Sequence, residues 1–269
     1  MIKERFLKAY SILAWTTMIL TSIVITPFFL LVWILTSWWD RRRVASHMMG
    51  TFWAWHYQSL IPFWKLELEG RKKIPWNRPV VIVANHRSLA DILALYKIRR
   101  PFKWVSKAEN FKLPFVGMVL SLTRSIKIHR GSLRSGFRFI NQAEAEMKKG
   151  SSVLIFPEGT RTKTGKMRNF QDGAFVLAKK MNCGIIPVVH TGTENTFGSG
   201  KRSWILAGKT RIRIRVLDEI PAATVSSMDV NELKEYTRRI MEQGLMKLGE
   251  YGPTHKRIPG NKDAGTTGS

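Results

Sequence analysis

A long uncharged segment near the amino terminus constrains this chain more than any other feature. No charged residue occurs between Ala9 and Trp39, a stretch of about 31 residues that would measure roughly 46 Å as one helix. This length exceeds the ~30 Å hydrocarbon core of a bilayer. It is also too long for the apolar core of a cleaved signal peptide, and no small-residue cleavage site precedes the flanking "WWDRRR". We therefore interpret the segment as a retained membrane anchor.

The anchor has two possible arrangements, because Pro27 lies near its middle and a proline removes a helical hydrogen bond. One is a single tilted and kinked span, and the other is a helical hairpin that returns to the same face of the bilayer. Basic residues flank both ends, namely Lys3, Arg5 and Lys8 before the segment and Arg41, Arg42 and Arg43 after it. The positive-inside rule thus places both ends in the cytoplasm and favours the hairpin. A buried core helix is disfavoured, because tryptophans beside an arginine cluster are typical of a membrane interface.

The overall charge indicates an anionic partner. The chain has 44 Lys plus Arg against 19 Asp plus Glu, a net charge of +25, which suits a phospholipid surface, a nucleic acid or a phosphorylated substrate. The aromatic residues concentrate in the apolar amino-terminal part, whereas nucleic-acid binding requires them among the basic strands, so no nucleic acid is expected. Cys183 is the one cysteine, which excludes an internal disulfide and a thiolate cluster and fits a cytosol-facing domain.

Beyond a second aromatic helix at Val44 to Trp64, β-like runs alternate with helical ones, which predicts a single α/β domain with a mostly buried mixed or parallel sheet covered by helices. We expect membrane-anchoring helices in residues 1–64, the α/β domain in 65–251 and a disordered tail in 252–269. The expected strands are "KLELEG", "PVVIVAN", "FKWVSK", "SIKIHR", "SSVLIFP", "GIIPVVH" and "KTRIRIRV". The expected helices cover about Leu89 to Leu95, Leu113 to Leu122, Leu133 to Lys148, Ala174 to Met181 and Val230 to Leu248.

The stretch "NHRSLAD", from Asn85 to Asp91, follows the apolar run "PVVIVA". Ser88 and Asp91 resemble a helix capping box with Asp in place of Glu. The cap does not explain His86, which would lie on the loop while Asp91 lies one turn into the helix, so the two side chains can meet. An aspartate that accepts a hydrogen bond from one imidazole nitrogen leaves the other nitrogen free to act as a base.

A second turn, "FPEGTR", follows the apolar strand "VLIF" and contains Glu158, Gly159 and Arg161. Taken alone it is an ordinary Pro-x-Gly turn at a strand end. A glycine there also lets the backbone approach a ligand, and an arginine can hold a phosphate through two charge-assisted hydrogen bonds. Ligands usually bind at the strand ends of α/β sheets.

"NHRSLAD", "FPEGTR" and "GIIPVV" occur in an order and spacing that resemble the glycerolipid acyltransferase family, whose bacterial archetype is 1-acylglycerol-3-phosphate acyltransferase. The resemblance covers roughly Trp64 to Val216. His86 and Asp91 match the family's first motif, a histidine and an aspartate separated by four residues. Its third motif matches "FPEGTR", and the proline of its fourth matches Pro187.

The family's second motif matches less well. Only Arg130 of "RSIKIHR" carries over, while His129 stands where an aspartate is common. Lys107 lies where the family often has a basic residue, and Gln171 stands where it tends to have a lysine. One contact to the substrate phosphate is therefore missing or supplied from elsewhere.

The resemblance implies acyl transfer from an acyl thioester, acyl-CoA or acyl-ACP, to the free sn-2 hydroxyl of lysophosphatidic acid, which forms phosphatidic acid in phospholipid biosynthesis. His86 would be the base and Asp91 would orient it. Arg130 and Arg161, with Lys107, would hold the acceptor phosphate, while Glu158 would bind the glycerol hydroxyl or organise the arginines. Gly159 would allow close approach. No permanently bound cofactor or metal is expected, and the partners are the two substrates, an anionic membrane and, with an acyl-ACP donor, acyl carrier protein.

Two alternatives remain open at this point. The enzyme could acylate another lysophospholipid, because the motifs indicate the chemistry better than the head group. The chain could also be a non-catalytic basic membrane-binding protein. In either enzymatic case the resemblance implies a membrane-associated protein with its catalytic domain on the cytoplasmic face, as at a bacterial inner membrane.

Overall fold

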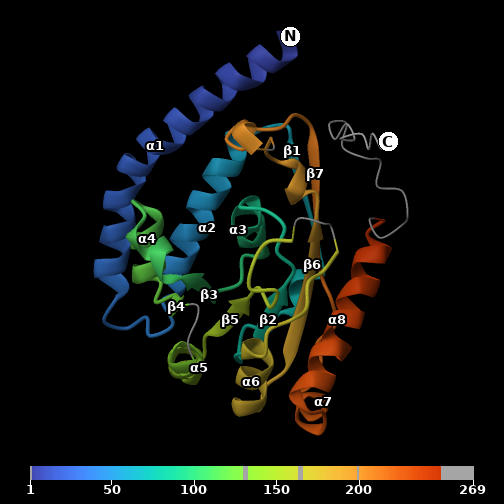
Figure 1. Cartoon of the computed structure of the whole chain (residues 1–269). Coiled ribbons are helices and arrows are strands. Elements are labelled where there is room, and N and C mark those ends of the chain that lie inside the picture. The colour runs from blue at the N-terminus through green and yellow to red at the C-terminus, as the bar shows by residue number, and fades with distance from the viewer. Residues whose placement is uncertain (1, 130–132, 163–165, 199, 250–269) are drawn as a thin grey trace, which may run out of the picture.

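The computed structural model describes residues 2–129, 133–162, 166–198 and 200–249. Arg130 and the expected tail at 252–269 therefore lie outside the described residues. The chain begins with two long helices, α1 (Ile2–Thr36) and α2 (Val44–Ser59), which run antiparallel beside the α/β domain (Figure 1). The second helix ends earlier than the sequence pattern indicates, because Trp64 already begins a strand.

The favoured hairpin within residues 9–39 is wrong, because α1 is one continuous helix that passes through Pro27 (Figure 1). The helix has no glycine or asparagine at which to turn. Its hydroxyl side chains instead bond back to carbonyls of the same helix, as Ser22 does to Met18 at 2.5 Å and Thr26 does to Ser22 at 2.7 Å. The chain reverses only after Thr36, so the antiparallel pair consists of α1 and α2.

The expected mixed α/β sheet is present. Its seven strands lie in the order β1-β7-β6-β2-β5-β3-β4, and every neighbouring pair is parallel except β6 and β7. The strands are β1 (Trp64–Glu69), β2 (Val81–Ala84), β3 (Phe102–Lys107), β4 (Ile126–Ile128), β5 (Ser152–Ile155), β6 (Ile185–Thr191) and β7 (Thr210–Val216). All seven coincide with runs expected from the sequence.

Helices cover both faces of this sheet, which explains why its central strands β2 and β5 are buried at every position. The remaining helices are α3 (Ala90–Leu95), α4 (Val116–Leu122), α5 (Leu133–Lys148), α6 (Gly173–Lys180), α7 (Ala222–Ser227) and α8 (Val230–Lys247). Successive residues of β2 enter different cores: Ile82 packs with residues of α1, α2 and α3, whereas Val81 and Val83 pack with residues of α5, α6 and α8. The short helix α7 has no counterpart in the expected pattern.

The sheet topology brings the sequence motifs to one edge. Strands β6, β2, β5, β3 and β4 are mutually parallel neighbours, so their carboxyl ends lie along the same edge of the sheet. His86 follows β2, the "FPEGTR" turn follows β5, and Lys107 ends β3. The candidate residues therefore share the edge at which α/β proteins usually bind ligands.

Candidate active site

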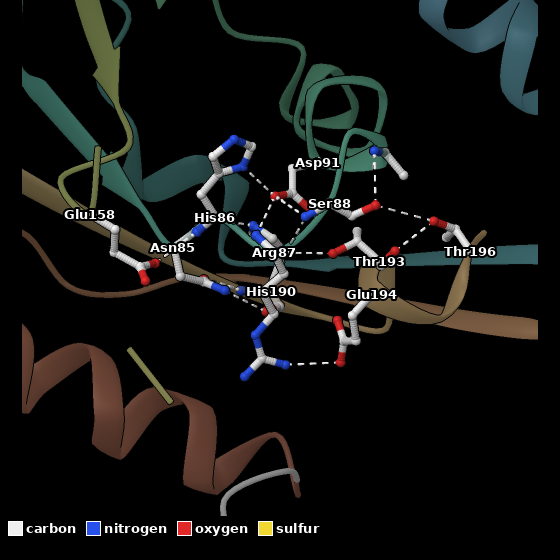
Figure 2. Close-up of polar contacts among 11 residues, drawn as sticks. Asn85, His86, Arg87, Ser88, Asp91, Glu158, His190, Thr193, Glu194 and Thr196 are labelled. Carbon is white, nitrogen blue, oxygen red and sulfur yellow. Dashed lines mark hydrogen bonds and ion pairs between the residues drawn. The ribbon is translucent and has the colours of Figure 1, made fainter. Parts of the chain in front are cut away.

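His86 and Asp91 are in direct contact, as the motif predicted. The Nδ1 atom of His86 lies 2.7 Å from the Oδ2 atom of Asp91 (Figure 2). An ionised carboxylate only accepts hydrogen bonds, so Nδ1 carries the hydrogen and Nε2 of the neutral ring carries the lone pair. Figure 2 shows this second nitrogen pointing away from Asp91. The His86 side chain is 18% exposed, whereas Asp91 is completely buried, so a substrate can reach the imidazole but not the carboxylate.

The turn between β2 and α3 creates this contact. Oδ2 of Asp91 also accepts the backbone N–H groups of Arg87 at 2.7 Å and Ser88 at 2.9 Å, which folds the loop around the carboxylate. The expected capping box is present only in part: the Asp91 carboxylate reaches back to Ser88, but the Ser88 hydroxyl accepts from Ala90 at 3.3 Å rather than from Asp91. The backbone N–H groups of Arg87 and Ser88 and the ring of His86 thus all bond to the same carboxylate oxygen, Oδ2 of Asp91.

An aromatic residue of the "FPEGTR" motif supports the imidazole ring. The ring of Phe156, which follows β5, stacks on that of His86 with a centroid separation of 4.1 Å and an interplanar angle of 13°. Trp104 of β3 lies on Phe156 in turn, at 6.0 Å between centroids. The open nitrogen of His86 therefore lies beside an apolar aromatic wall. Phe156 belongs to the "FPEGTR" motif, but its contact with His86 was not predicted.

Glu158 holds the backbone of the catalytic loop. Its side chain is only 3% exposed, and its two oxygens accept the backbone N–H groups of His86 and Arg168, each at 2.9 Å. Burial raises the pKa of Glu158, although the two N–H groups act in the opposite direction. In this arrangement the carboxylate joins the two motifs to each other, and both of its oxygens already have donors. The expectation that it binds the glycerol hydroxyl stays a prediction.

Gly159 closes the turn after β5. Its N–H donates to the carbonyl of Phe156 at 3.0 Å, and its φ of 67° lies in the left-handed region that glycine tolerates best. An added Cβ would meet only the Cγ atom of Gln171, at an ordinary contact distance of 3.5 Å. Conformation rather than space therefore requires glycine here.

The two described cations of the predicted phosphate site, Arg161 and Lys107, are exposed at the same edge of the sheet. Arg161 follows the turn after β5, and Lys107 ends β3, the next strand beyond β5. Lys107 is thus two strands away from β2, roughly 10 Å across the sheet. Both residues are placed where a substrate could contact them, and their role in binding it stays a prediction. The third cation, Arg130, is outside the described residues.

A buried histidine that the sequence reasoning missed lies behind the pair. His190, near the end of β6, is completely buried, and its Nδ1 atom lies 3.8 Å from Oδ1 of Asp91. Its Nε2 atom lies 2.6 Å from the carbonyl oxygen of Asn85. The sequence did contain a signal for this contact. His190 is a polar residue near the end of a mostly apolar strand, and a buried polar residue needs a hydrogen-bond partner in the protein interior.

An ion pair between Arg87 and Glu194 lies next to the site. The guanidinium of Arg87, within the first motif, donates to the carboxylate of Glu194 at 2.9 Å (Figure 2). Glu194 lies in the short 3₁₀ helix η4 (Thr193–Asn195) that follows β6. This ion pair joins the first motif to the segment after the fourth, and the sequence offered no signal for it.

The buried carboxylate is ionised. Burial opposes the charge on Asp91, but the hydrogen bonds from His86 and from the N–H of Ser88 favour the charge, and the pKa of Asp91 lies below its ordinary value. Burial lowers the pKa of His190, although Asp91 acts against this. The site therefore contains a charged aspartate between two imidazoles, of which only His86 is accessible. Among the described residues, no cluster of three or more His, Cys, Asp or Glu could hold a metal ion.

Comparison with known proteins shows which family this part of the chain resembles. Residues 65–191, which contain both motifs, match the family model described as Acyltransferase. Residues 65–191 are therefore similar to this family. Over 172 residues it is 39% identical to a 1-acyl-sn-glycerol-3-phosphate acyltransferase from Chlamydomonas reinhardtii, covering 64% of this chain and 51% of that protein. It is 34% identical over 134 residues to a protein of the same name from Borreliella burgdorferi, covering 49% of this chain and 54% of that one.

A solved structure confirms the fold of this chain. The crystal structure of the 1-acyl-sn-glycerophosphate acyltransferase PlsC from Thermotoga maritima matches 94% of this chain and 99% of that one, with a TM-score of 0.75 at 23% identity. The matched segments span about half the length of the Chlamydomonas protein and of an Arabidopsis thaliana relative, at 51% and 48%. The similarity to the acyltransferase family is thus shown for residues 65–191, while the activity of the whole chain is a matter for proposal.

Proposed function

We propose that this chain transfers an acyl group from an acyl thioester to the sn-2 hydroxyl of lysophosphatidic acid, which forms phosphatidic acid. The observation that carries this proposal is the 2.7 Å contact between His86 and Asp91, which leaves an accessible imidazole nitrogen at the carboxyl edge of the sheet. The names of the relatives and the exposed cations at the same edge of the sheet support the same substrate.

The geometry supports direct transfer without a covalent enzyme intermediate. Nε2 of His86 takes the proton of the acceptor hydroxyl as the oxygen attacks the thioester carbonyl. The carbon–sulfur bond then breaks, and the departing thiolate takes the proton from the imidazolium. A hydroxyl is a very weak acid near neutral pH, so a positioned base contributes about 100-fold to 10,000-fold. Asp91 stabilises the imidazolium through its hydrogen bond to Nδ1.

The donor proposed is acyl-CoA or acyl-ACP, and both carry the thioester that this chemistry requires. Both are also anionic, which suits a chain with a net charge of +25. Neither donor needs a metal or a permanently bound cofactor for acyl transfer. The chain would therefore use the thioester as a co-substrate and release the free thiol.

An acceptor lipid is held in the bilayer, and the two amino-terminal helices suit that location. Helix α1 has a mean hydropathy of 2.5 over its most apolar 18-residue window, enough by length and composition to cross a membrane. It presents a row of exposed large apolar side chains, namely Phe6, Ile12, Leu13, Ile19, Leu20, Ile23, Val24, Phe28, Leu31, Ile34 and Leu35. Trp38 and Trp39 in the turn and Phe52 and Trp55 on α2 are exposed as well.

We infer that α1 and α2 lie in one leaflet, with the domain on the cytoplasmic face. The amino-terminal half of α1 is held to the domain, since Ser11 accepts the N–H of Leu206 at 2.9 Å. The other half packs on α2 through Phe29 and Trp53, and α2 contacts the domain through His47, whose ring lies 4.7 Å from that of Phe102. Both halves of helix α1 are thus attached to the rest of the protein, and neither is free to cross the bilayer alone. Protease sites placed at both flanks of α1 in sealed vesicles should be cleaved from the same side, and cleavage from opposite sides would contradict this placement.

The activity is tested with the purified full-length chain in mixed micelles, radiolabelled acyl-CoA or acyl-ACP, and lysophosphatidic acid. Labelled phosphatidic acid is the expected product. Lysophosphatidylcholine, lysophosphatidylethanolamine and lysophosphatidylglycerol serve as competing acceptors in the same assay. Preference for one of these would replace the proposed substrate while retaining the chemistry, and absence of transfer to every acceptor would reject acyltransferase activity.

Replacing Arg161 with Ala is expected to weaken use of the acceptor specifically. The guanidinium is exposed beside the site, and a charge-assisted hydrogen bond to a phosphate contributes roughly 1.5–3 kcal/mol. The KM for lysophosphatidic acid should therefore rise by about tenfold or more, with little change in the KM for the thioester. Arg168→Ala is the matched control. Arg168 is also an exposed arginine, and its bond to Glu158 uses the backbone N–H, which the substitution leaves in place. An unchanged acceptor KM in Arg161→Ala would remove this residue from the phosphate site.

A further inference from the structure

One peptide unit next to the base is held at both of its ends. The carbonyl of Asn85 and the N–H of His86 belong to the same peptide group. The carbonyl oxygen lies 2.6 Å from Nε2 of His190, and the N–H donates to Glu158 at 2.9 Å (Figure 2). A carbonyl oxygen can only accept, so Nε2 of His190 carries the hydrogen. The backbone from which the catalytic imidazole projects is therefore fixed by two buried side chains, those of Glu158 and His190.

His190 is itself fixed to the same loop. The Asn85 side chain accepts the backbone N–H of His190 and donates to its backbone carbonyl, both at 2.9 Å. These two bonds reproduce the pairing of neighbouring strands one residue beyond the end of β2. Because the ring of His190 bonds the backbone of Asn85 while the side chain of Asn85 bonds the backbone of His190, neither residue can shift without the other.

The second nitrogen of His190 faces the aspartate. With its hydrogen on Nε2, the neutral ring has its lone pair on Nδ1, where the Thr193 hydroxyl lies 3.4 Å away and can donate. Nδ1 is 3.8 Å from Oδ1 of Asp91, which has no hydrogen-bond partner among the residues that the structure describes. Every described hydrogen bond of the carboxylate is therefore made by Oδ2, the oxygen that holds His86. A neutral His190 leaves the charge of Asp91 available to His86.

We propose that His190 is a positioning residue for the His86–Asp91 pair: its Nε2–H fixes the peptide before His86, and its neutral ring leaves Oδ1 of Asp91 without a competing donor. This inference rests on the proposed function for its kinetic test, because it assigns a role at the same site. His190 makes no contact with solvent and does not take part in the proton transfer.

Three substitutions separate positioning from packing. His190→Leu removes both ring nitrogens at similar volume. His190→Gln restores a donor near the position of Nε2, toward Asn85, whereas His190→Asn places an amide near the position of Nδ1, toward Asp91. If His190 served only for packing, the rates of the three variants would follow how well each side chain fills the space of the imidazole. If His190 positions the loop, the glutamine variant would keep its rate, because it retains the donor toward Asn85.

The expected kinetic result is a change in kcat with nearly constant KM. His190→Leu and His190→Asn should lower kcat by roughly 10- to 100-fold, because small displacements of a catalytic group carry large kinetic penalties. The KM values of both substrates should stay within about threefold, and His190→Gln should recover most of the rate. Equal rates in the glutamine and asparagine variants, or a loss confined to KM, would overturn the proposal. If the leucine variant does not fold, the comparison of glutamine with asparagine still decides.

A control and an independent readout complete the test. Ile186→Ala creates a cavity on the same strand and the same face of β6, so it should lower the Tm without lowering kcat by more than about threefold. The NMR signal of the His86 Nδ1–H, assigned by its loss in His86→Gln, should shift or broaden in His190→Leu and stay near its original position in His190→Gln. An unmoved signal in every variant would refute the inference even if the proposed acceptor proved wrong.

Discussion

Replacing His86 with Ala is expected to lower the rate of acyl transfer by roughly 100-fold to 10,000-fold, the contribution of a positioned general base. Its Nε2 is the accessible nitrogen of the pair, and Asp91 is completely buried, so the carboxylate cannot take the acceptor proton directly. The loss should fall on kcat, since the cations proposed to bind the acceptor phosphate are unchanged. The measurement is single-turnover transfer of radiolabelled acyl groups in mixed micelles, which separates chemistry from product release.

The His86→Ala variant should remain folded. The carboxylate of Asp91 keeps its hydrogen bonds from the backbone of Arg87 and Ser88, and the loop keeps the contact between Glu158 and residue 86, because that contact uses backbone N–H. The main structural loss is the ring stacked on Phe156. A matched control is His56→Gln, which removes another imidazole, on α2, and should retain full activity. If His86→Ala kept more than about a tenth of the wild-type rate, His86 would not be the base.

Replacing Asp91 with Asn should have the second largest effect, by a different route. The backbone N–H groups of Arg87 and Ser88 and the ring N–H of His86 all point at Oδ2, so the amide oxygen must occupy that position. The amide nitrogen then lies at the position of Oδ1, facing the lone pair on Nδ1 of His190 3.8 Å away. The variant should therefore keep the tautomer of His86 and lose only the negative charge.

The rate of Asp91→Asn is expected to fall by roughly 10- to 100-fold, less than in His86→Ala, because a hydrogen bond to a charged group contributes about 1.5–3 kcal/mol. The imidazolium is less stabilised without the carboxylate, so the pH below which activity is lost should move downward. The pH dependence of kcat/KM measures this shift. A loss of rate as large as that of His86→Ala, with no shift on the acidic side of the pH profile, would contradict this expectation. It would indicate that the side-chain amide had rotated by 180° and reversed the tautomer of His86.

Asp91→Ala distinguishes the structural part of this role from the chemical part. It removes the acceptor of two backbone N–H groups at buried residues, and each unsatisfied group costs about 1–3 kcal/mol. We therefore expect Asp91→Ala to lower the Tm clearly, whereas Asp91→Asn should change it little. Similar Tm values for the two variants would show that the loop does not depend on the carboxylate.

Much of the fold could be predicted from local pattern. The strands "PVVIVA" and "VLIF" are continuous apolar runs, which is typical of strands covered on both faces, and β2 and β5 are the central strands found there. The contact between His86 and Asp91 could be predicted because both belong to one turn of seven residues. The hairpin prediction failed at Pro27, because one proline removes only one hydrogen bond, which a long helix packed against α2 and the domain can tolerate.

The sequence by itself determined the short-range features of this protein: the alternation of strands and helices, the apolar anchor, and the histidine and aspartate of a single loop. Only the tertiary structure decided the contacts of Glu158 and His190 with the peptide at His86, because Glu158 follows β5 and His190 lies near the end of β6, more than 70 positions away along the chain. Such contacts depend on strand order and register, which place β5 and β6 on either side of β2. Sequence periodicity specifies that a residue is buried, and only the packing of strands and helices specifies which residues it contacts.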